Sequence, residues 1–339
     1  MIRRPRPLAV SNWLFLVTVM VFLMVVIGGI TRLTESGLSI TRWDPVSGII
    51  PPLSDDAWQA EFNAYKATPE YQQINRGMSI AAFKAIYFWE YLHRALGRLI
   101  GLVVAVPLIW FALTRAIPRG YGPRLVALLA LGGFQGFIGW WMVKSGLVDR
   151  TDVSHFRLAA HLGTALVIMG FALWLALSLR DKARPRLPVG DRPRGWILPY
   201  FLLLGAQIKF GAFVAGLNGG YAFNTWPKMG EDWIAPHVVQ KIGSSLGVLF
   251  NDAITVQFVH RWLAVLVTLY ALHIAGKLWR NRVVLPSLAM ALTVIGQFAL
   301  GVATLVNGVP IWLGVAHQTG GALLVGASVW AAHRVTRPR

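Results

Sequence analysis

Long apolar runs dominate this chain and constrain its fold more than any other feature. Each run is long enough to cross the ~30 Å apolar core of a lipid bilayer as a helix. The chain is 55% hydrophobic and only 14% charged over 339 residues, which is too apolar for a soluble domain of this size. The sequence therefore predicts an all-α polytopic membrane protein embedded in a lipid bilayer. Eight transmembrane helices are expected at residues 12–31, 85–113, 125–143, 158–179, 196–216, 253–276, 283–306 and 309–333.

The basic residues are distributed unevenly between the two sides of these runs. A net charge of +18 would favour a nucleic-acid partner in a soluble protein. Here the charge falls in loops between the runs, so membrane topology explains it and no nucleic-acid partner is expected. The positive-inside rule places the more basic set of segments, and with it both termini, in the cytoplasm. That set comprises residues 1–11, 114–124, 180–195, 277–282 and 334–339.

The start of the chain and its lack of cysteine restrict the compartment and the cofactor chemistry. Residues 1–11 are basic, and no small-residue cleavage site follows the first apolar run, so we expect that run to be a retained helix. The short basic start is not typical of a mitochondrial presequence, which favours a bacterial inner membrane. The absence of cysteine excludes disulfides, thiolate-bound iron–sulfur clusters and covalently attached c-type haem.

The chain divides into two similar halves, residues 1–179 and 196–339, joined by a Pro- and Arg-rich linker at 180–195. Each half holds four predicted helices, so both halves begin on the same side of the membrane. The repeat is therefore parallel, and it predicts two four-helix bundles related by a pseudo-twofold axis along the membrane normal. The matching segments include Gly28 to Trp43 with Gly211 to Trp226, and Gln135 and Gly139 with Gln297 and Gly301.

Two long segments are expected on the outer face, at residues 32–84 and 217–252. The first contains a stretch of mixed aromatic and polar residues, Ala57 to Ala67, which is too polar to span a bilayer. We expect it to form short helices that lie over the outer face of the N-terminal half.

Four histidines recur in register in the two halves and lie near the outer ends of their helices: His93, His161, His260 and His317. Imidazole is costly in apolar surroundings without a partner, and it is a common metal ligand. Two pairs of histidines in two related bundles predict two bis-histidine haem sites, with haem iron as the metal. The alternatives are hydrogen-bonded packing residues or a proton path. The remaining histidines lack repeat partners and are expected to be structural: His155, His237, His273 and His333.

A carboxylate distinguishes the two halves. Glu90 precedes His93 by three residues and shares its helix face, whereas Gln257 stands at the equivalent place before His260. A buried carboxylate can accept a proton or stabilise developing positive charge, and an amide cannot titrate. We therefore predict that the first half is the reactive site and that the second holds a cofactor or passes electrons. The alternative is that Glu90 only pairs with Arg94 or Arg98.

Besides Arg98, three cations lie within the predicted helices. Arg94 and Arg261 directly follow their histidines and could pair with haem propionates, since guanidinium matches carboxylate geometry. Equally, both could extend to the outer interface with only their stems in the apolar layer. Lys209 has no ionic counterpart in the first half and is a functional candidate by position alone.

Several segments together resemble the haem A synthases of bacteria and mitochondria over nearly the whole chain. Some members of that family carry a cysteine pair in an outer loop, so this chain is similar to the cysteine-free proteobacterial and mitochondrial-like branch. The segments that carry the resemblance are Gly28 to Pro52, Glu90 to Arg94, Phe134 to Leu147, His155 to Leu166, Gly211 to Met229, Gln257 to Ala264 and Ala316 to Val325.

The resemblance implies an enzyme that oxidises the C8 methyl group of haem O. The first product is a hydroxymethyl group (haem I), and a second oxidation gives a gem-diol that loses water to leave the formyl group of haem A. The resemblance also implies that the N-terminal half holds haem O between His93 and His161, with Glu90 catalytic. His260 and His317 then match the ligands of a haem b that relays electrons.

The partners implied by the resemblance are a haem O synthase, an electron donor and the assembling cytochrome oxidase that receives haem A. A different class of function also fits the four histidines, namely a di-haem b-type electron-transfer cytochrome, although that function leaves Glu90 unexplained. A parallel-repeat transporter with histidines in a proton path is a third possibility.

Overall fold

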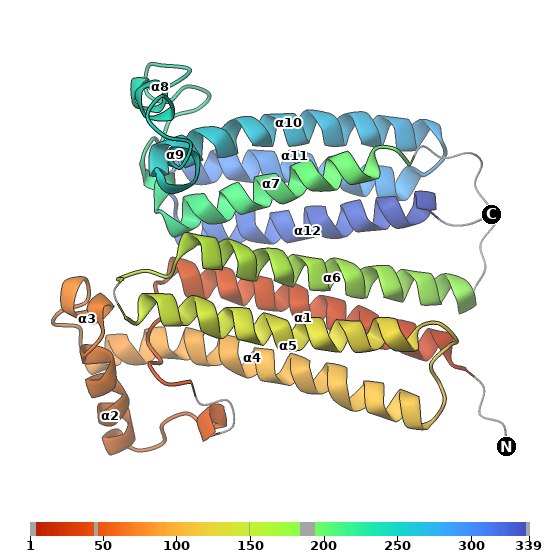
Figure 1. Ribbon diagram of the computed structural model, residues 1–339, viewed down its shortest axis with the longest axis horizontal. Coiled ribbons are helices and arrows are strands. Elements are labelled where there is room, and N and C mark those ends of the chain that lie inside the picture. Colours follow the sequence, from red (N-terminus) through yellow and green to blue (C-terminus); the bar gives the residue numbers. More distant parts are fainter. Residues whose placement is uncertain (1–4, 44–46, 149, 184–193, 337–339) are drawn as a thin grey trace.

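The computed structural model describes residues 5–43, 47–148, 150–183 and 194–336, and within them the chain is almost entirely helical (Figure 1). Residues 184–193 of the linker predicted at 180–195 lie outside the described residues. Within the described residues, eight long helices are present: α1 (Pro7–Leu33), α4 (Ile80–Leu113), α5 (Gly122–Gly146), α6 (His155–Ala183), α7 (Ile197–Gly216), α10 (Ala253–Arg280), α11 (Val284–Val306) and α12 (Ile311–Thr336).

All eight predicted helices are confirmed as helices, and most extend beyond the predicted apolar runs. Helix α4 begins at Ile80 rather than at residue 85, because the Ser79 side chain accepts a hydrogen bond from the Ala82 amide and caps the first turn. Helix α6 begins at His155 rather than at residue 158. Capping side chains and polar turns therefore decide where these helices begin, and hydropathy alone underestimates their length.

Seven of the described helices are long and apolar enough to cross a membrane, which makes this a multi-pass membrane protein. The eighth long helix, α12, is not among the seven, although it is 26 residues long. It carries three consecutive polar residues, His317 to Thr319, which lower its mean hydropathy. Helix α12 packs against α1, α6 and α11 and is lined with buried residues, so its polar side chains have protein neighbours.

The long helices lie side by side and form two groups (Figure 1). Helices α1, α4, α5 and α6 form one group, and α7, α10, α11 and α12 form the other. Helices α1 and α6 contact α12 across the boundary, and α6 also contacts α7. Both described ends of the chain lie at one end of the helices. The short helices lie at the opposite end: α2 (Asp55–Lys66), α3 (Pro69–Gln73), α8 (Pro236–Ile242) and α9 (Val248–Asn251).

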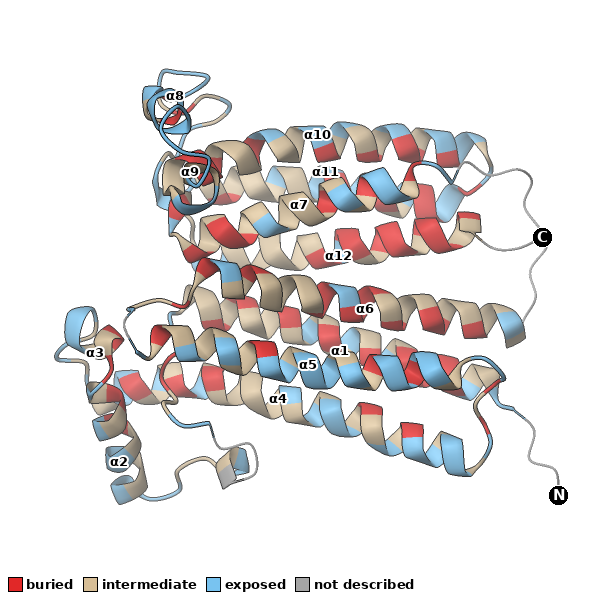
Figure 2. Cartoon of the chain, in the orientation of Figure 1, coloured by how far each residue is buried: buried red, intermediate tan, exposed pale blue. Residues whose placement is uncertain are grey.

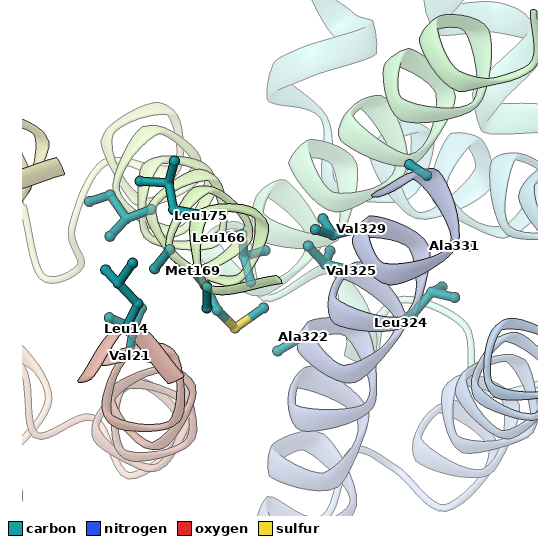
Figure 3. Close-up of a cluster of buried hydrophobic side chains, with 14 of the residues drawn as sticks. Leu14, Val21, Leu166, Met169, Leu175, Ala322, Leu324, Val325, Val329 and Ala331 are labelled. Atoms are coloured by element: carbon teal, nitrogen blue, oxygen red, sulfur yellow. The ribbon is translucent and has the colours of Figure 1, made fainter. Parts of the chain in front are cut away.

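The main hydrophobic core lies where α1, α6 and α12 meet (Figure 3). Small side chains such as Ala172 and Ala322 are fully or almost fully buried there, which lets the helices approach closely. Polar groups in this region are paired internally, since Ser11 Oγ of α1 donates to the Ala176 carbonyl of α6 at 2.8 Å. The outward faces of α4 and α5 are exposed instead (Figure 2) and carry large apolar residues, as expected of faces that contact lipid.

The short helices expected in the first long loop are confirmed. That loop, which we call the first outer segment after its predicted side, contains the 3-10 turn η1 (Ser47–Ile49), α2 (Asp55–Lys66) and α3 (Pro69–Gln73). The second long loop, named the second outer segment in the same way, contains η2 (Gly219–Tyr221), α8 (Pro236–Ile242) and α9 (Val248–Asn251). Stacked aromatic rings fix α2 to the N-terminal end of α4, with Phe62 and Tyr65 of α2 against Phe83 of α4. These contacts bury the aromatic face of α2, whereas Gln59 and Asn63 on its other face are exposed.

A buried carboxyl group lies within this outer segment. Glu70 is 3% exposed, and its Oε2 accepts a hydrogen bond of 3.3 Å from the Tyr65 hydroxyl, which in turn accepts one of 2.8 Å from Asn75 Nδ2. Burial raises the pKa of Glu70 from its usual 4.5 to about 8, and the nearby negative charges of Glu90 and Glu35 act in the same direction. The folded outer segment therefore favours a protonated Glu70.

We predict that the outer segment loosens as the pH rises. The folded state raises the pKa of Glu70. The stability that Glu70 contributes to this segment is therefore fully present below pH 4.5 and is lost as the pH rises toward about 8. Amide hydrogen exchange in α2 and α3 should accelerate, beyond its intrinsic pH dependence, by up to about tenfold per pH unit in that window. Glu70→Gln should remove this excess, whereas the control Glu61→Gln should keep it. An unchanged pH profile in Glu70→Gln would contradict the assignment.

Candidate haem sites

The structure brings the four predicted histidines together in two pairs. The rings of His93 on α4 and His161 on α6 have centroids 6.4 Å apart, and their planes are inclined by 45°. The rings of His260 on α10 and His317 on α12 are 6.5 Å apart and inclined by 88°. Since a metal–imidazole nitrogen bond is about 2 Å long and the ring centre lies about 1 Å behind that nitrogen, two imidazoles on opposite sides of one metal ion have centres about 6 Å apart. Both pairs match this spacing.

The donor set of each pair fits a haem better than a bare metal ion. Each pair supplies two imidazoles, and no group of three or more His, Asp or Glu side chains able to hold a metal ion occurs within the described residues. A bare zinc ion usually takes three or four protein ligands. A porphyrin supplies four nitrogens of its own and leaves two axial positions, which two histidines can fill.

Glutamines contact three of the four histidines. Gln135 Nε2 of α5 lies 3.2 Å from His161 Nδ1, and Gln297 Nε2 of α11 lies 3.2 Å from His317 Nδ1. Gln207 Nε2 of α7 lies 3.5 Å from His260 Nε2. The buried Nδ1 atoms of His93 and His260 have no hydrogen-bond partner within the described part of the chain. A ligating histidine is commonly oriented through a ring nitrogen, and these glutamines are the side chains placed to do so.

Glu90 is buried and accepts hydrogen bonds from two directions. It is 3% exposed, and its Oε2 accepts from Ser39 Oγ at 2.7 Å and from the Ile40 amide at 2.8 Å. Its Oε1 accepts from Arg94 Nη2 at 2.6 Å and from Arg94 Nε at 3.1 Å. All four partners donate to oxygen, which is the arrangement that an ionised carboxylate accepts. Of the alternatives open from the sequence, the Glu90–Arg94 ion pair is present.

Arg94 also donates hydrogen bonds to the backbone of the outer segment that follows α1. Its Nη2 and Nη1 donate to the carbonyls of Ile40 and Arg42, both at 2.9 Å, and its guanidinium lies 5.3 Å from the Trp43 ring centre. The guanidinium is therefore engaged by protein on several sides. We call Glu90, Arg94 and the segment Ser39 to Trp43 the first arginine clamp.

The second half repeats this arrangement with Gln257 in place of Glu90. Arg261 Nη2 donates to Gln257 Oε1 at 3.2 Å and to the Phe223 carbonyl at 2.8 Å, and its Nη1 donates to the Thr225 carbonyl at 2.6 Å. Its guanidinium lies 5.9 Å from the Trp226 ring centre. The sequence alignment of Gly28 to Trp43 with Gly211 to Trp226 contained the signal for this second arginine clamp, but it did not reveal which carbonyls the arginines bind.

The other polar candidates lie apart from the histidine pairs. His155 packs against Phe156 and Phe213, His237 Nε2 lies 3.0 Å from Asp252 Oδ2, and His333 Nε2 lies 3.1 Å from Ser178 Oγ. Lys209 is exposed on α7, so its position does not support a role inside the bundle.

Comparison with known proteins agrees with this geometry. The profile of a family described as cytochrome oxidase assembly protein matches residues 11–329. The chain belongs to this family. Relatives named heme A synthase include those of Rhizorhabdus wittichii, 51% identical over 99% of this chain and 96% of the relative, and Sphingopyxis alaskensis, 47% identical over 98% and 94%. The heme A synthase of Rhodospirillum centenum is 48% identical over 98% of this chain and 90% of its own length. The resemblance to haem A synthases is thereby confirmed.

We predict that the first arginine clamp contributes more to the stability of the folded protein than the second. Arg94→Met leaves a buried carboxylate without its counter-ion, which costs about 3–5 kcal/mol. Arg261→Met leaves only a neutral amide and carbonyls without a donor, which costs about 1–3 kcal/mol. Thermal unfolding of the purified variants in detergent micelles should therefore show the larger loss for Arg94→Met. Equal losses would show that the charge on Glu90 adds nothing to the first clamp.

Proposed function

We propose that this chain is a haem A synthase, an oxidoreductase that converts the C8 methyl group of haem O, through haem I, to the formyl group of haem A. Haem A is then used in assembling cytochrome oxidase. The observation that carries the proposal is the presence of two imidazole pairs at one haem-bridging distance, with a carboxylate beside only one of them. The family and its heme A synthase relatives support the same function.

We propose that all eight long helices span the bacterial inner membrane and that both termini lie in the cytoplasm. Helix α12 completes the second bundle, and at 26 residues it is about 39 Å long, enough to cross the apolar core. The described parts of the basic segments lie at the end of the helices where the described chain begins and ends. In this topology the histidine pairs and the arginine clamps lie toward the periplasm, in halves bounded by 1–179 and 196–339.

The two pairs have different roles in this proposal. His93 and His161 hold the substrate haem O in the N-terminal half. His260 and His317 hold a haem b in the C-terminal half, and that group supplies one-electron transfer. Gln297 lies against the ring of His317 and restrains it. An electron donor and a haem O synthase are the proposed partners on the supply side, and assembling cytochrome oxidase is the recipient.

Glu90 sets the charge of the reactive half. Glu90 and Arg94 form a neutral pair, whereas Gln257 leaves Arg261 as an uncompensated positive charge in the second clamp. The two halves therefore differ by one unit of charge at equivalent positions. Oxidation of a methyl group develops positive character at carbon, and a neutral pair one helical turn from His93 opposes that charge less than the uncompensated arginine of the second half would. Because four donors occupy its oxygens, Glu90 acts as a fixed charge in this reaction.

Haem analysis of the purified protein tests the proposed function. A visible spectrum and chromatography of acid-extracted haems should show haem B together with haem O, I or A. Haem B alone would favour a di-haem electron-transfer cytochrome. A colourless protein would contradict both functions and favour the proton-path interpretation of the histidines.

Glu90→Gln tests the charge assignment. The variant should fold, because the second half holds its clamp with a glutamine at this position. We expect conversion of haem O to fall about 100-fold or more, the loss typical of removing one group that stabilises transition-state charge, with the haem b content unchanged. Asp56→Asn, at an exposed acid of α2, is the control and should keep normal conversion. Normal conversion in Glu90→Gln, or loss of haem b from it, would overturn the assignment.

A further inference from the structure

We propose that four glycines are positioning residues for the four histidines, each fixing the rotation of one imidazole ring by contact with its Cε1 edge. The inference rests on the proposed haem sites and adds to them the residues that orient the ligands. Each glycine lies on a helix other than that of its histidine. The pairs are Gly28 with His93, Gly139 with His161, Gly211 with His260 and Gly301 with His317.

In the first half, neither glycine position has room for a side chain without moving a ring. A Cβ atom at Gly28 of α1 would lie 3.1 Å from His93 Cε1. A Cβ atom at Gly139 of α5 would lie 2.9 Å from His161 Cε1. Carbon atoms prefer separations of about 3.5–4.0 Å. Each imidazole is therefore seated directly against the backbone of the neighbouring helix.

The second half shows the same contacts at the same ring atom. A Cβ atom at Gly211 of α7 would lie 2.9 Å from His260 Cε1, and one at Gly301 of α11 would lie 2.8 Å from His317 Cε1. The helices correspond as well, since α1 and α7 begin their halves and α5 and α11 precede the second histidine of each pair. Four contacts to one atom type, in register, show that both halves place their imidazole rings against a neighbouring helix in the same way.

Other glycines of the same helices do not face a predicted ligand. Some have no atom within 4 Å of an added Cβ, namely Gly136 of α5, Gly205 of α7 and Gly296 of α11. Others pack closely against different side chains, as Gly29 of α1 does against Gln318 and Gly146 of α5 does against Leu38. Contact with the Cε1 edge of a predicted ligand therefore belongs to the four histidine-facing positions. The chain itself provides a matched control in three of the four helices.

Two of the rings have no hydrogen bond at Nδ1. The Nδ1 atoms of His93 and His260 are buried without a hydrogen-bond partner in the described structure, and the one polar contact of the His260 ring is Gln207 Nε2, 3.5 Å from Nε2. A metal-ligating histidine usually has its ring fixed by a hydrogen bond from the second nitrogen. The backbone at Gly28 lies close to the His93 ring, and the backbone at Gly211 lies close to the His260 ring. Each close contact blocks rotation of the Cε1 edge of the ring. Iron ligation needs the nitrogen lone pair aimed at the metal in the ring plane, so ring rotation controls the strength of the bond.

The test uses the full-length protein, with haem b content and spectroscopy as readouts. Gly211→Ala and Gly301→Ala should lower the apparent affinity for haem b about 10- to 100-fold, the loss typical of removing a group that orients a metal ligand. They should also shift the low-spin ferric EPR g values, which depend on the angle between the axial imidazole planes. Gly205→Ala and Gly296→Ala should match the unaltered protein in both readouts.

The first half provides an independent check on folding. Gly139→Ala should weaken retention of haem O while haem b content and its EPR signal stay normal, and Gly136→Ala should change neither. Loss of both haems from Gly139→Ala, or unchanged haem binding and EPR spectra in all the histidine-facing variants, would overturn the inference. Absence of haem from the unaltered protein would instead overturn the proposed function, so the two failures are distinguishable.

Discussion

An apolar membrane interior obliges every polar side chain to find its partner within the protein, and the arrangement of this molecule follows from that constraint. Glu90 illustrates it, since all of its partners come from Arg94 and from the segment that returns after α1. The same requirement at Arg261 is met by backbone carbonyls and Gln257. These hydrogen bonds fix the path of the two outer segments, together with the apolar clusters of each segment, and join them to the helices that carry His93 and His260.

The repeat explains how one scaffold can supply two sites of different chemistry. Both halves hold two imidazoles at nearly equal spacing, and both fasten an outer segment through an arginine next to a histidine. The two arginine clamps differ in one side chain, a carboxylate at Glu90 and an amide at Gln257. Because both side chains accept a hydrogen bond from the neighbouring arginine, this exchange changes charge while leaving the geometry of the clamp in place.

The sequence predicted the helices and the histidine pairs because both depend on local or periodic information. An apolar run specifies a helix, and repetition in register brings His93 to His161 and His260 to His317. The arginine clamps could not be predicted, since Arg94 and Arg261 bind carbonyls whose directions depend on how the outer segments fold. The glycine contacts could not be predicted from the sequence for a related reason. Gly28 and Gly211 were identified as matching positions, but only the helix packing shows that each faces a ring edge.

The sites are held mainly by helices, which favours a rigid ligand geometry over an adaptable one. The core between α1, α6 and α12 sets the helix positions (Figure 3). Helix α1 contributes residues to that core, and its Gly28 lies against the ring edge of His93. A shift of α1 would therefore disturb both the first histidine pair and the contact of α1 and α6 with α12. Substitutions at that contact are thus expected to act on the first half by moving its backbone, without any change in its histidines.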